Sequence, residues 1–216
     1  MARNIANSIV GDKPQNRHSS DFYRTPEEAV DALLLQESIK IGSPFQIYIR
    51  EPACGDGAIS NTLEMNHHIV LSSDLYDRGY GIAGINFLNE THEFYKGKEW
   101  KYDLITNPPF SLANQFILKA YSLPVRKIAF LMKLTALEGK VRSEILEFTQ
   151  LSRIHVFRTR INMYPEKDKE RSKNGGMIAF AWFIWNRSQQ QDKSKAPEIY
   201  WIGENESNLS QDSLFD

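Results

Sequence analysis

The sequence of 216 residues contains a single cysteine, Cys54, and this scarcity excludes two kinds of scaffold. One cysteine forms neither an intramolecular disulfide nor a cysteine-based zinc site, so the fold must be held by a buried core. At roughly 150 residues per domain, the length predicts one domain with extensions, which is large enough for such a core. A reducing compartment is expected, and the cytoplasm meets that requirement.

Long hydrophobic runs are also absent. The longest apolar run, Met177 to Trp185, has nine residues, whereas a membrane-spanning helix needs about 20. Residues 1–20 contain no apolar segment of the kind found in secretory signals, so neither a signal nor a membrane partner is expected. His67 and His68 have no further ligand at a metal-binding spacing, so no metal site is expected either.

The sequence has almost no net charge. It has 26 Lys and Arg residues against 27 Asp and Glu residues, a formal net charge of −1. Taken alone, this balance argues against a nucleic-acid partner. However, residues 126–142 carry a local charge of +4 and residues 158–173 carry +3, whereas residues 204–216 contain acids and no base. The balance therefore excludes a general polycation but not a nucleic-acid enzyme.

Strand and helix patterns alternate between residues 21 and 187. Strands separated by helices predict an α/β fold with a mostly parallel sheet and helices on both faces. The aromatic residues of 177–185 fit a buried central strand. Strand-like runs occur at 45–49, 68–74, 102–106, 127–132, 153–157 and 177–185, and helical spacing occurs after Thr25 and at about 137–148.

The start of the first helix is marked by Thr25-Pro26-Glu27-Glu28. Thr25 as N-cap, Pro26 at the first helical position and Glu28 at the third form a capping box. The polar ends of the chain lack helical or strand periodicity. We expect an arm at residues 1–20, the main domain at 21–187, and a polar extension at 188–216 with a short strand near 199–202.

Three unusual segments follow predicted strands, where ligands bind in parallel sheets. The first is Glu51-Pro-Ala-Cys-Gly-Asp-Gly57. Gly55 and Gly57 permit a sharp turn and a close backbone approach to a ligand. The third glycine of a dinucleotide fingerprint is replaced by Ser60, so the turn does not favour a pyrophosphate. On its own, the segment fits a simple tight turn equally well.

The second segment is Asp74, at the end of the next predicted strand and 23 residues after Glu51. An acidic side chain at this place can accept hydrogen bonds from both hydroxyls of a ribose. Alone, Asp74 is better explained as a residue that starts a turn. Together with the glycine turn at this spacing, it favours a nucleoside-binding site.

The third segment is Asn107-Pro108-Pro109-Phe110, directly after the strand pattern 102–106. Two prolines remove two amide donors and stiffen the chain, so the Asn107 side-chain oxygen and the Pro108 carbonyl can point outward as paired acceptors. Such a pair suits the two N–H groups of a planar exocyclic amine, and Phe110 offers a ring for a base. Elsewhere Asn-Pro marks a simple loop. In a nucleoside-binding sheet, we interpret the segment as an amine site.

In combination these segments resemble the S-adenosylmethionine-dependent DNA adenine-N6 methyltransferases, above all the small type common in bacteriophages and prophages. The likeness covers residues 21–187. It implies a Rossmann-like class I methyltransferase fold with a seven-stranded sheet, S-adenosylmethionine as cofactor, and a bacterial or phage-infected host cell. The matching segments are, in the order of the family, Tyr23-x-Thr25-Pro26, Glu51 to Gly57, Ser73-Asp74, Asn86-Phe87 and Asn107-Pro-Pro-Phe110.

The resemblance also implies roles for individual residues. Asn107, Pro108, Pro109 and Phe110 stand at the catalytic positions. The family usually has Asp where this sequence has Asn86, whose oxygen can still accept from an adenine amine. The implied cofactor-binding residues are Tyr23, Thr25 and Pro26 at the methionine part, Glu51, Pro52, Ala53, Cys54, Gly55 and Gly57 in the loop beneath it, Asp74 with Leu75 at the ribose, and Asn86 and Phe87 at the adenine, on whose face Phe87 would pack.

The implied reaction is displacement of the sulfonium methyl by the adenine N6 amine, whose lone pair is delocalised into the ring. Acceptors at Asn107 and Pro108 would favour a pyramidal amine and localise that lone pair. Catalysis would then depend on orientation and electrostatics rather than on a strong base. In double-stranded DNA the adenine must first be flipped out, with Phe110 stacking on it.

Nucleic-acid contacts are expected from basic residues that follow strands on the active-site side. Without a nucleic acid, both basic segments would be solvated loops. In the family that the sequence resembles, members with strong sequence specificity carry a separate recognition module. No large insertion separates Gly57 from Asn107 here, so we expect low or short-sequence specificity, supplied by the loop 158–176, the tails or a partner protein. The basic residues concerned are Lys133, Lys140, Arg142, Arg158, Arg160, Lys167, Lys169, Arg171 and Lys173.

Two alternatives stay open. Adenine-N6 methylation of RNA and glutamine-amide methylation of protein use the same acceptors; the basic segments favour nucleic acid, and Phe110 favours adenine. Asn86 in place of Asp also permits a catalytically silent nucleic-acid-binding module, although such a module would have no reason to keep the acceptors. A restriction partner, evasion of host defence and regulation all fit the sequence as biological roles.

Overall fold

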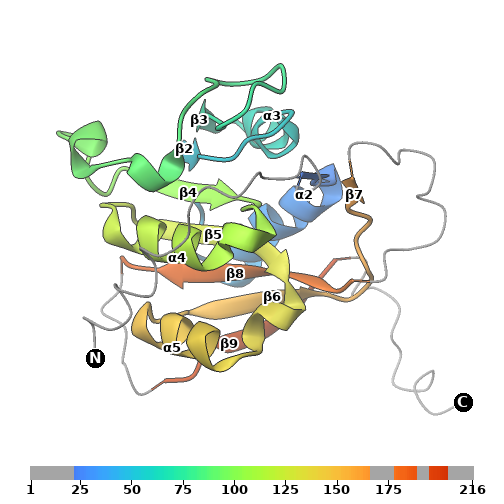
Figure 1. The fold of residues 1–216 in the computed structure, drawn as a ribbon. Coiled ribbons are helices and arrows are strands. Elements are labelled where there is room, and N and C mark those ends of the chain that lie inside the picture. The colour runs from blue at the N-terminus through green and yellow to red at the C-terminus, as the bar shows by residue number, and fades with distance from the viewer. Residues whose placement is uncertain (1–21, 166–177, 189–194, 204–216) are drawn as a thin grey trace, which may run out of the picture.

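The computed structural model describes residues 22–165, 178–188 and 195–203. Its centre is a seven-stranded sheet of order β3-β2-β4-β5-β8-β6-β9 (Figure 1). β8 is antiparallel to β5 and β6, and the other neighbouring strands are parallel. This confirms the predicted α/β fold with a mostly parallel sheet. The strands are β2 (Tyr48–Glu51), β3 (Ile69–Ser72), β4 (Tyr102–Thr106), β5 (Lys127–Lys133), β6 (Arg153–Phe157), β8 (Phe180–Asn186) and β9 (Glu198–Ile202).

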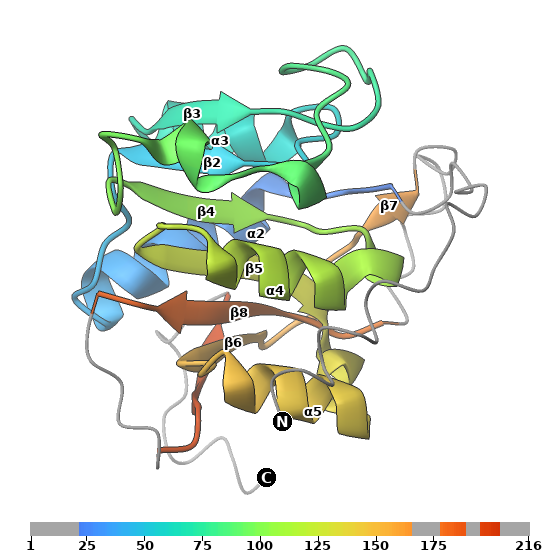
Figure 2. The same cartoon turned by 60° about the vertical axis from the view of Figure 1, so that its left-hand side comes forward.

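Helices cover both faces of the sheet, α4 and α5 on one face and α2 and α3 on the other (Figure 2). The α-helices are α2 (Glu27–Leu35), α3 (Ala58–Met65), α4 (Ala113–Ser122) and α5 (Lys140–Phe148). A π-helical segment, η2 (Gln36–Lys40), continues α2. The 3-10 helices are η3 (Phe87–Asn89), η4 (His92–Tyr95), η5 (Phe110–Leu112) and η6 (Leu134–Leu137).

Successive side chains along each strand point to opposite faces of the sheet and pack into two separate hydrophobic cores. Leu104 of β4 packs with α4 and α5, whereas its neighbour Ile105 packs with α2 and α3. Such strands are apolar on both faces, as expected where helices cover a sheet on each side. β8 follows the same rule, since Trp182 and Trp185 are buried in opposite cores. The aromatic run is therefore the buried central strand that the sequence predicted.

Several element boundaries differ from the sequence-based prediction. The capping box at α2 is wrong: the N-cap is Pro26, without a side-chain cap, because the Thr25 hydroxyl accepts a hydrogen bond from Asn107 instead. α5 begins at Lys140 rather than near residue 137, because Gly139, with φ 94°, separates it from η6. β2 begins at Tyr48 rather than residue 45, where pairing with β3 and β4 starts.

The ends of the described chain add two further pairings. β1 (Tyr23–Arg24) pairs antiparallel with β7 (Tyr164–Pro165) in a small separate sheet. The short strand predicted near 199–202 is present as β9, which lies parallel to β6 at the edge of the main sheet. The polar extension thus contributes a strand to the same sheet. In the described part of the chain, no helix has the length and apolar composition needed to cross a membrane.

A buried ionic cluster lies at the amino ends of β5 and β6. Glu37 is fully buried and accepts hydrogen bonds from Lys127 (2.7 Å), Arg153 (2.6 and 2.7 Å) and His155 (2.7 Å). Burial alone would raise the pKa of Glu37, but the bonds from His155 and Arg153 and the charges of Lys127 and Arg153 outweigh it and hold that pKa well below its usual range. The cluster is a structural brace, since it sits at the edge opposite the carboxyl ends of these strands.

Candidate active site

The glycine turn after β2 has the sharp backbone that the sequence predicted. Gly55 (φ 57°) and Gly57 (φ 83°) both lie in the left-handed region, which glycine adopts without strain. A Cβ atom on Gly55 would overlap the ring of Phe22, and one on Gly57 would overlap the ring of Tyr80. Two aromatic rings thus stand directly against the turn, where only glycine leaves room for them.

Asp74 braces this turn from the end of β3. One of its carboxylate oxygens accepts from the Gly55 amide at 2.9 Å, and the other accepts from the Tyr76 amide at 2.9 Å. It therefore starts a turn, as one of the two sequence-based interpretations has it, and also holds the glycine loop. The other interpretation, that it binds a ribose, stays a prediction. Each carboxylate oxygen keeps a further lone pair for a ligand hydroxyl. Leu75 follows it, half-buried.

Glu51 lies at the base of the loop, 1% exposed. Its carboxylate accepts from the Ser60 hydroxyl, which is also 2.6 Å from the Ser72 hydroxyl. Burial raises the pKa of Glu51 to about 8, an effect that the Ser60 bond only partly offsets. Burial likewise raises the pKa of Cys54 to about 12. The thiol stays protonated near neutral pH, so Cys54 is a packing residue rather than a nucleophile.

Asn107 follows β4 directly and carries an unpaired acceptor. Its amide nitrogen donates to the Tyr23 carbonyl at 3.0 Å and to the Thr25 hydroxyl at 3.3 Å. These bonds fix the orientation of the amide. The Asn107 side-chain oxygen is buried and has no hydrogen-bond partner among the described residues. A buried acceptor without a donor is costly, so the site is suited to a ligand that donates N–H groups.

Phe110 forms an aromatic cluster beside Asn107. Its ring centroid lies 5.1 Å from that of Tyr23 and 5.8 Å from that of Phe180. The Lys133 ammonium stands 4.2 Å from the Phe110 centroid, within cation–π range. Lys133, which the sequence predicts to bind nucleic acid, therefore contacts the predicted catalytic segment. Pro108 is buried and Pro109 half-buried, which keeps the short connection from β4 rigid.

The segment from Phe22 to Pro26 spans the glycine turn and Asn107. Arg24 forms an ion pair with Asp56 in the turn, and the Tyr23 carbonyl and Thr25 hydroxyl hold Asn107. Pro26 begins α2 immediately afterwards. The residues that the resemblance assigns to the methionine part of a cofactor are thus brought to the same place as the loop of residues 51–57.

Asn86 and Phe87 both have contacts within the described part of the fold. The Asn86 side-chain oxygen accepts from the Leu88 amide at 3.1 Å and caps η3. Phe87 is only 2% exposed, and its ring centroid lies 5.0 Å from that of Phe116 in α4. The ring is therefore packed against α4 in the described fold, and its packing on an adenine face stays a prediction.

Sequence analysis missed the buried ion pair that supports the site. Arg50 is 1% exposed and pairs with Glu90 at 2.8 Å. The same guanidinium donates to the carbonyls of Glu51 and Leu71, each at 2.9 Å, and to the Ser73 hydroxyl at 2.6 Å. It therefore ties together the ends of β2 and β3 that carry the glycine loop and Asp74. The available signal was a charged residue inside an otherwise apolar strand.

The basic residues other than Lys133 divide into three groups. Lys140 and Arg142 occupy the first turn of α5, beyond the carboxyl end of β5. Arg158 and Arg160 follow the carboxyl end of β6 and are exposed. β5 and β6 are both antiparallel to β8, so their carboxyl ends share one edge of the sheet. The remaining predicted residues lie outside the described chain: Lys167, Lys169, Arg171 and Lys173.

The site offers oxygen acceptors, a glycine turn and aromatic rings, all at the carboxyl edge of the sheet. This donor and acceptor set fits a nucleoside with hydroxyl and amine groups better than a metal ion. Among the described residues, no group of three or more His, Cys, Asp or Glu side chains is placed to hold a metal.

No protein-family model and no curated protein matches the sequence. Solved structures match the fold. A protein described as an RNA methyltransferase from Pyrococcus horikoshii is 17% identical, with a TM-score of 0.57; the match covers 85% of this chain and 95% of that one. A type I restriction-modification methyltransferase subunit from Streptococcus thermophilus is 12% identical, with a TM-score of 0.55, over 80% of this chain and 46% of that one.

A third similar structure is the magnesium protoporphyrin IX methyltransferase from Synechocystis, solved with S-adenosylmethionine bound. It is 13% identical, with a TM-score of 0.50, over 87% of this chain and 92% of that one. At sequence identities this low, the structural likeness shows the fold alone. The chain has the Rossmann-like class I methyltransferase fold. The chain spans about half the length of the restriction-modification subunit.

Proposed function

We propose that this protein uses S-adenosylmethionine to methylate the exocyclic N6 amine of adenine in DNA, with low or short-sequence specificity. One observation carries the proposal: the Asn107 side-chain oxygen is a buried acceptor without a partner among the described residues, and its amide is held by Tyr23 and Thr25. The N–H group of an amine would donate the hydrogen bond that this buried oxygen does not otherwise receive. The class I methyltransferase fold supports the cofactor.

The cofactor would occupy the carboxyl edge of β2 and β3. Bound there, S-adenosylmethionine supplies a methyl group on a positively charged sulfur. Asp74 would accept from the ribose hydroxyls with its free lone pairs, and the glycine turn would let the backbone approach closely. Phe22 and Tyr80 stand against that turn, so they would shift or pack on the ligand as it enters.

Asn107 would bind and orient the target amine. Acceptance of one N–H by its side-chain oxygen and of the other by the Pro108 carbonyl would make the nitrogen pyramidal and localise its lone pair. The lone pair would then face the methyl carbon that the bound cofactor would supply, and the sulfur would keep the electron pair of the carbon–sulfur bond. The amine releases one proton to solvent afterwards. Orientation and electrostatics supply the rate enhancement.

The nucleic acid would run along the same edge. Lys133 lies at Phe110, and Arg158 and Arg160 are exposed beyond β6, so positive charge surrounds the amine site. Phe110 would stack on a flipped adenine after giving up part of its contact with Tyr23. A partner protein that supplies specificity is also proposed, because the similar Streptococcus thermophilus protein is described as a subunit of a restriction-modification system.

Transfer of radiolabelled methyl to unmethylated DNA, RNA and bulk protein tests the proposal directly. Label is expected in DNA, on N6-methyladenine after digestion, and Asn107→Ala is expected to abolish it. Label in RNA alone or in glutamine amides would replace DNA as the substrate. Cofactor binding without transfer to any of the three would favour a silent binding module.

A further inference from the structure

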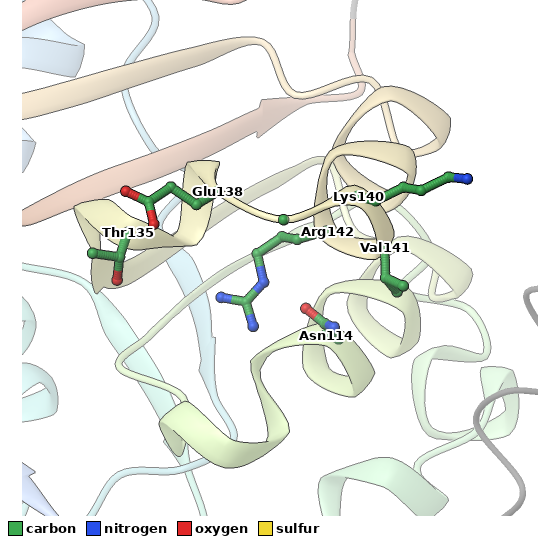
Figure 3. Close-up of a pocket in the computed structure, with 7 residues that line it drawn as sticks. Asn114, Thr135, Glu138, Lys140, Val141 and Arg142 are labelled. Carbon is green, nitrogen blue, oxygen red and sulfur yellow. The ribbon is translucent and has the colours of Figure 1, made fainter.

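A groove of about 570 Å³ opens next to the candidate active site (Figure 3). It lies between the first turn of α4, η6 and the start of α5, and Asn114, Thr135, Glu138 and Arg142 line it. Asn114 follows Phe110 by four residues, and Thr135 follows Lys133 by two. The groove is thus only a few residues along the chain from the amine site, and it is wide open to solvent.

Arg142 places an unpaired charge in this groove. Figure 3 shows its guanidinium between Thr135 and Asn114. Burial lowers the pKa of Arg142, and no hydrogen bond or ion pair joins it to another described residue. Arg50 and Arg153, by contrast, pair with buried carboxylates. Arg142 is half-buried, so its guanidinium has lost part of its water and an anion in the groove would compensate for that loss.

Asn114 adds an unpaired acceptor to the same groove. Its side-chain oxygen is buried and has no hydrogen-bond partner among the described residues. A phosphodiester has no donor to offer this oxygen, so a backbone phosphate by itself would satisfy Arg142 alone. A nucleotide would satisfy both residues, because its phosphate accepts from Arg142 and a base amine donates to Asn114.

We propose that the groove holds a nucleotide adjacent to the target adenine in the same strand, with Arg142 on its phosphate and the Asn114 oxygen on its exocyclic amine. This inference rests on the proposed function and names a second contact of the same substrate. Adenine, cytosine and guanine carry such an amine and thymine does not. The groove therefore disfavours thymine at one position next to the target, which is a short-sequence preference.

Substitution of Glu138 tests whether a phosphate binds beside Arg142 in the groove. Glu138 is exposed at the groove and forms no ion pair with Arg142. Its carboxylate repels a phosphate held beside it, so Glu138→Gln is expected to tighten DNA binding while Arg142→Gln weakens it. Opposite effects of two neutralising substitutions in one groove are not expected from a solvated loop.

The first experiment measures binding of a labelled DNA duplex by fluorescence anisotropy, with S-adenosylhomocysteine present and with KCl varied. Arg142→Gln is expected to raise Kd roughly tenfold and to reduce the salt slope by about one. Lys101→Gln removes the same charge at the amino end of β4, outside the proposed site, and is expected to leave both quantities unchanged. Equal Kd and salt slope for Arg142→Gln and wild type would overturn the proposal.

The second experiment compares duplexes that differ only at the two positions flanking the target adenine. Wild type is expected to methylate thymine-flanked sites about tenfold less efficiently at one flank, the range of a single lost base contact. Asn114→Ala is expected to remove this preference and to leave methylation of thymine-flanked sites unchanged. A preference that persists in Asn114→Ala contradicts the assignment of the amine contact.

Urea unfolding tests whether Arg142→Gln weakens DNA binding only because it destabilises the fold. Because Arg142 has no described partner, Arg142→Gln is expected to unfold at the same or a higher urea concentration than wild type without DNA. A lower concentration would show that Arg142 has a structural partner and would overturn the proposal. If wild type neither binds nor methylates DNA, the proposed function fails; if it does both and the groove variants match it, only the groove inference fails.

Discussion

Asn107 donates a hydrogen bond from its side-chain amide to the carbonyl of Tyr23 at 3.0 Å, across 84 residues of sequence. This bond orients the amide, because its nitrogen is held by the Tyr23 carbonyl. The side-chain oxygen has no hydrogen-bond partner among the described residues and faces the site. The strand pair β1–β7 in turn holds Tyr23 in place. The proposed catalytic acceptor is therefore oriented by the first described strand of the chain rather than by its own loop.

Removal of the Asn107 acceptor is expected to abolish most methyl transfer. Asn107→Ala should lower kcat by roughly 10²–10³, the range for loss of one oriented polar group at a reacting centre, and should leave the Kd for S-adenosylhomocysteine within about threefold. Thr25→Val removes only the 3.3 Å contact and keeps the Tyr23 bond, so its kcat should fall much less. Single-turnover transfer and calorimetry measure the two quantities, and an equal loss in both variants would contradict the assignment.

The buried carboxyl of Glu51 is expected to make stability fall as pH rises. Its folded-state pKa of about 8 exceeds the usual 4.5, so above pH 4.5 the folded state holds a proton that the unfolded chain loses. The free energy of unfolding should therefore decline between pH 4.5 and pH 8, by up to ~5 kcal/mol from this group.

Glu51→Gln should flatten that decline, and the variant should gain stability relative to wild type as pH rises to 8. The exposed Glu28→Gln serves as the control and should follow the wild-type profile. Urea unfolding at several pH values measures the difference. A constant difference between Glu51→Gln and wild type across this range would show that burial does not shift this group.

The ionic cluster around Glu37 is expected to contribute strongly to the stability of the fold. Glu37→Gln leaves Lys127 and Arg153 buried without their counter-charge, and loss of one partner of a buried pair typically costs about 3–5 kcal/mol. Glu93→Gln breaks an exposed pair with Lys96 and should cost less than about 1 kcal/mol. Urea midpoints give both values, and similar losses in the two variants would refute the importance of burial.

A methyl group at Gly55 is expected to affect both stability and ligand binding. Gly55→Ala introduces left-handed strain, worth about 1–2 kcal/mol, and an overlap with the Phe22 ring. Gly42→Ala has a similar φ of 65° and no neighbour within 4 Å, so it reports the strain alone. Gly55→Ala should unfold more easily than Gly42→Ala and bind S-adenosylhomocysteine more weakly.

The addition of Phe22→Ala to Gly55→Ala separates the two effects. The double variant loses the overlap, so its additional destabilisation relative to Phe22→Ala should approach that of Gly42→Ala. Thermal unfolding of the four variants provides the comparison. If the double variant shows no such recovery, Phe22 does not lie against the glycine turn.

The sequence determined the alternation of strands and helices and the order of the motifs, because apolar periodicity and glycine or proline punctuation are local properties. β4 and β6 match their predicted strands residue for residue, and β9 lies within one residue of the predicted one. The places of Gly55, Asp74 and Asn107 at one sheet edge also follow from local pattern, since carboxyl ends of parallel strands meet there.

Only the tertiary structure decided what the polar groups contact. Thr25 looked like a helix cap and instead holds Asn107. Arg50 was visible as a charge inside an apolar strand, but its partner Glu90, 40 residues away, was not. Hydrogen bonds and ion pairs depend on which distant atoms come within about 3 Å, and no local pattern in a single chain encodes that distance. The unpaired oxygens of Asn107 and Asn114, on which both proposals rest, could be recognised only once all other partners were in place.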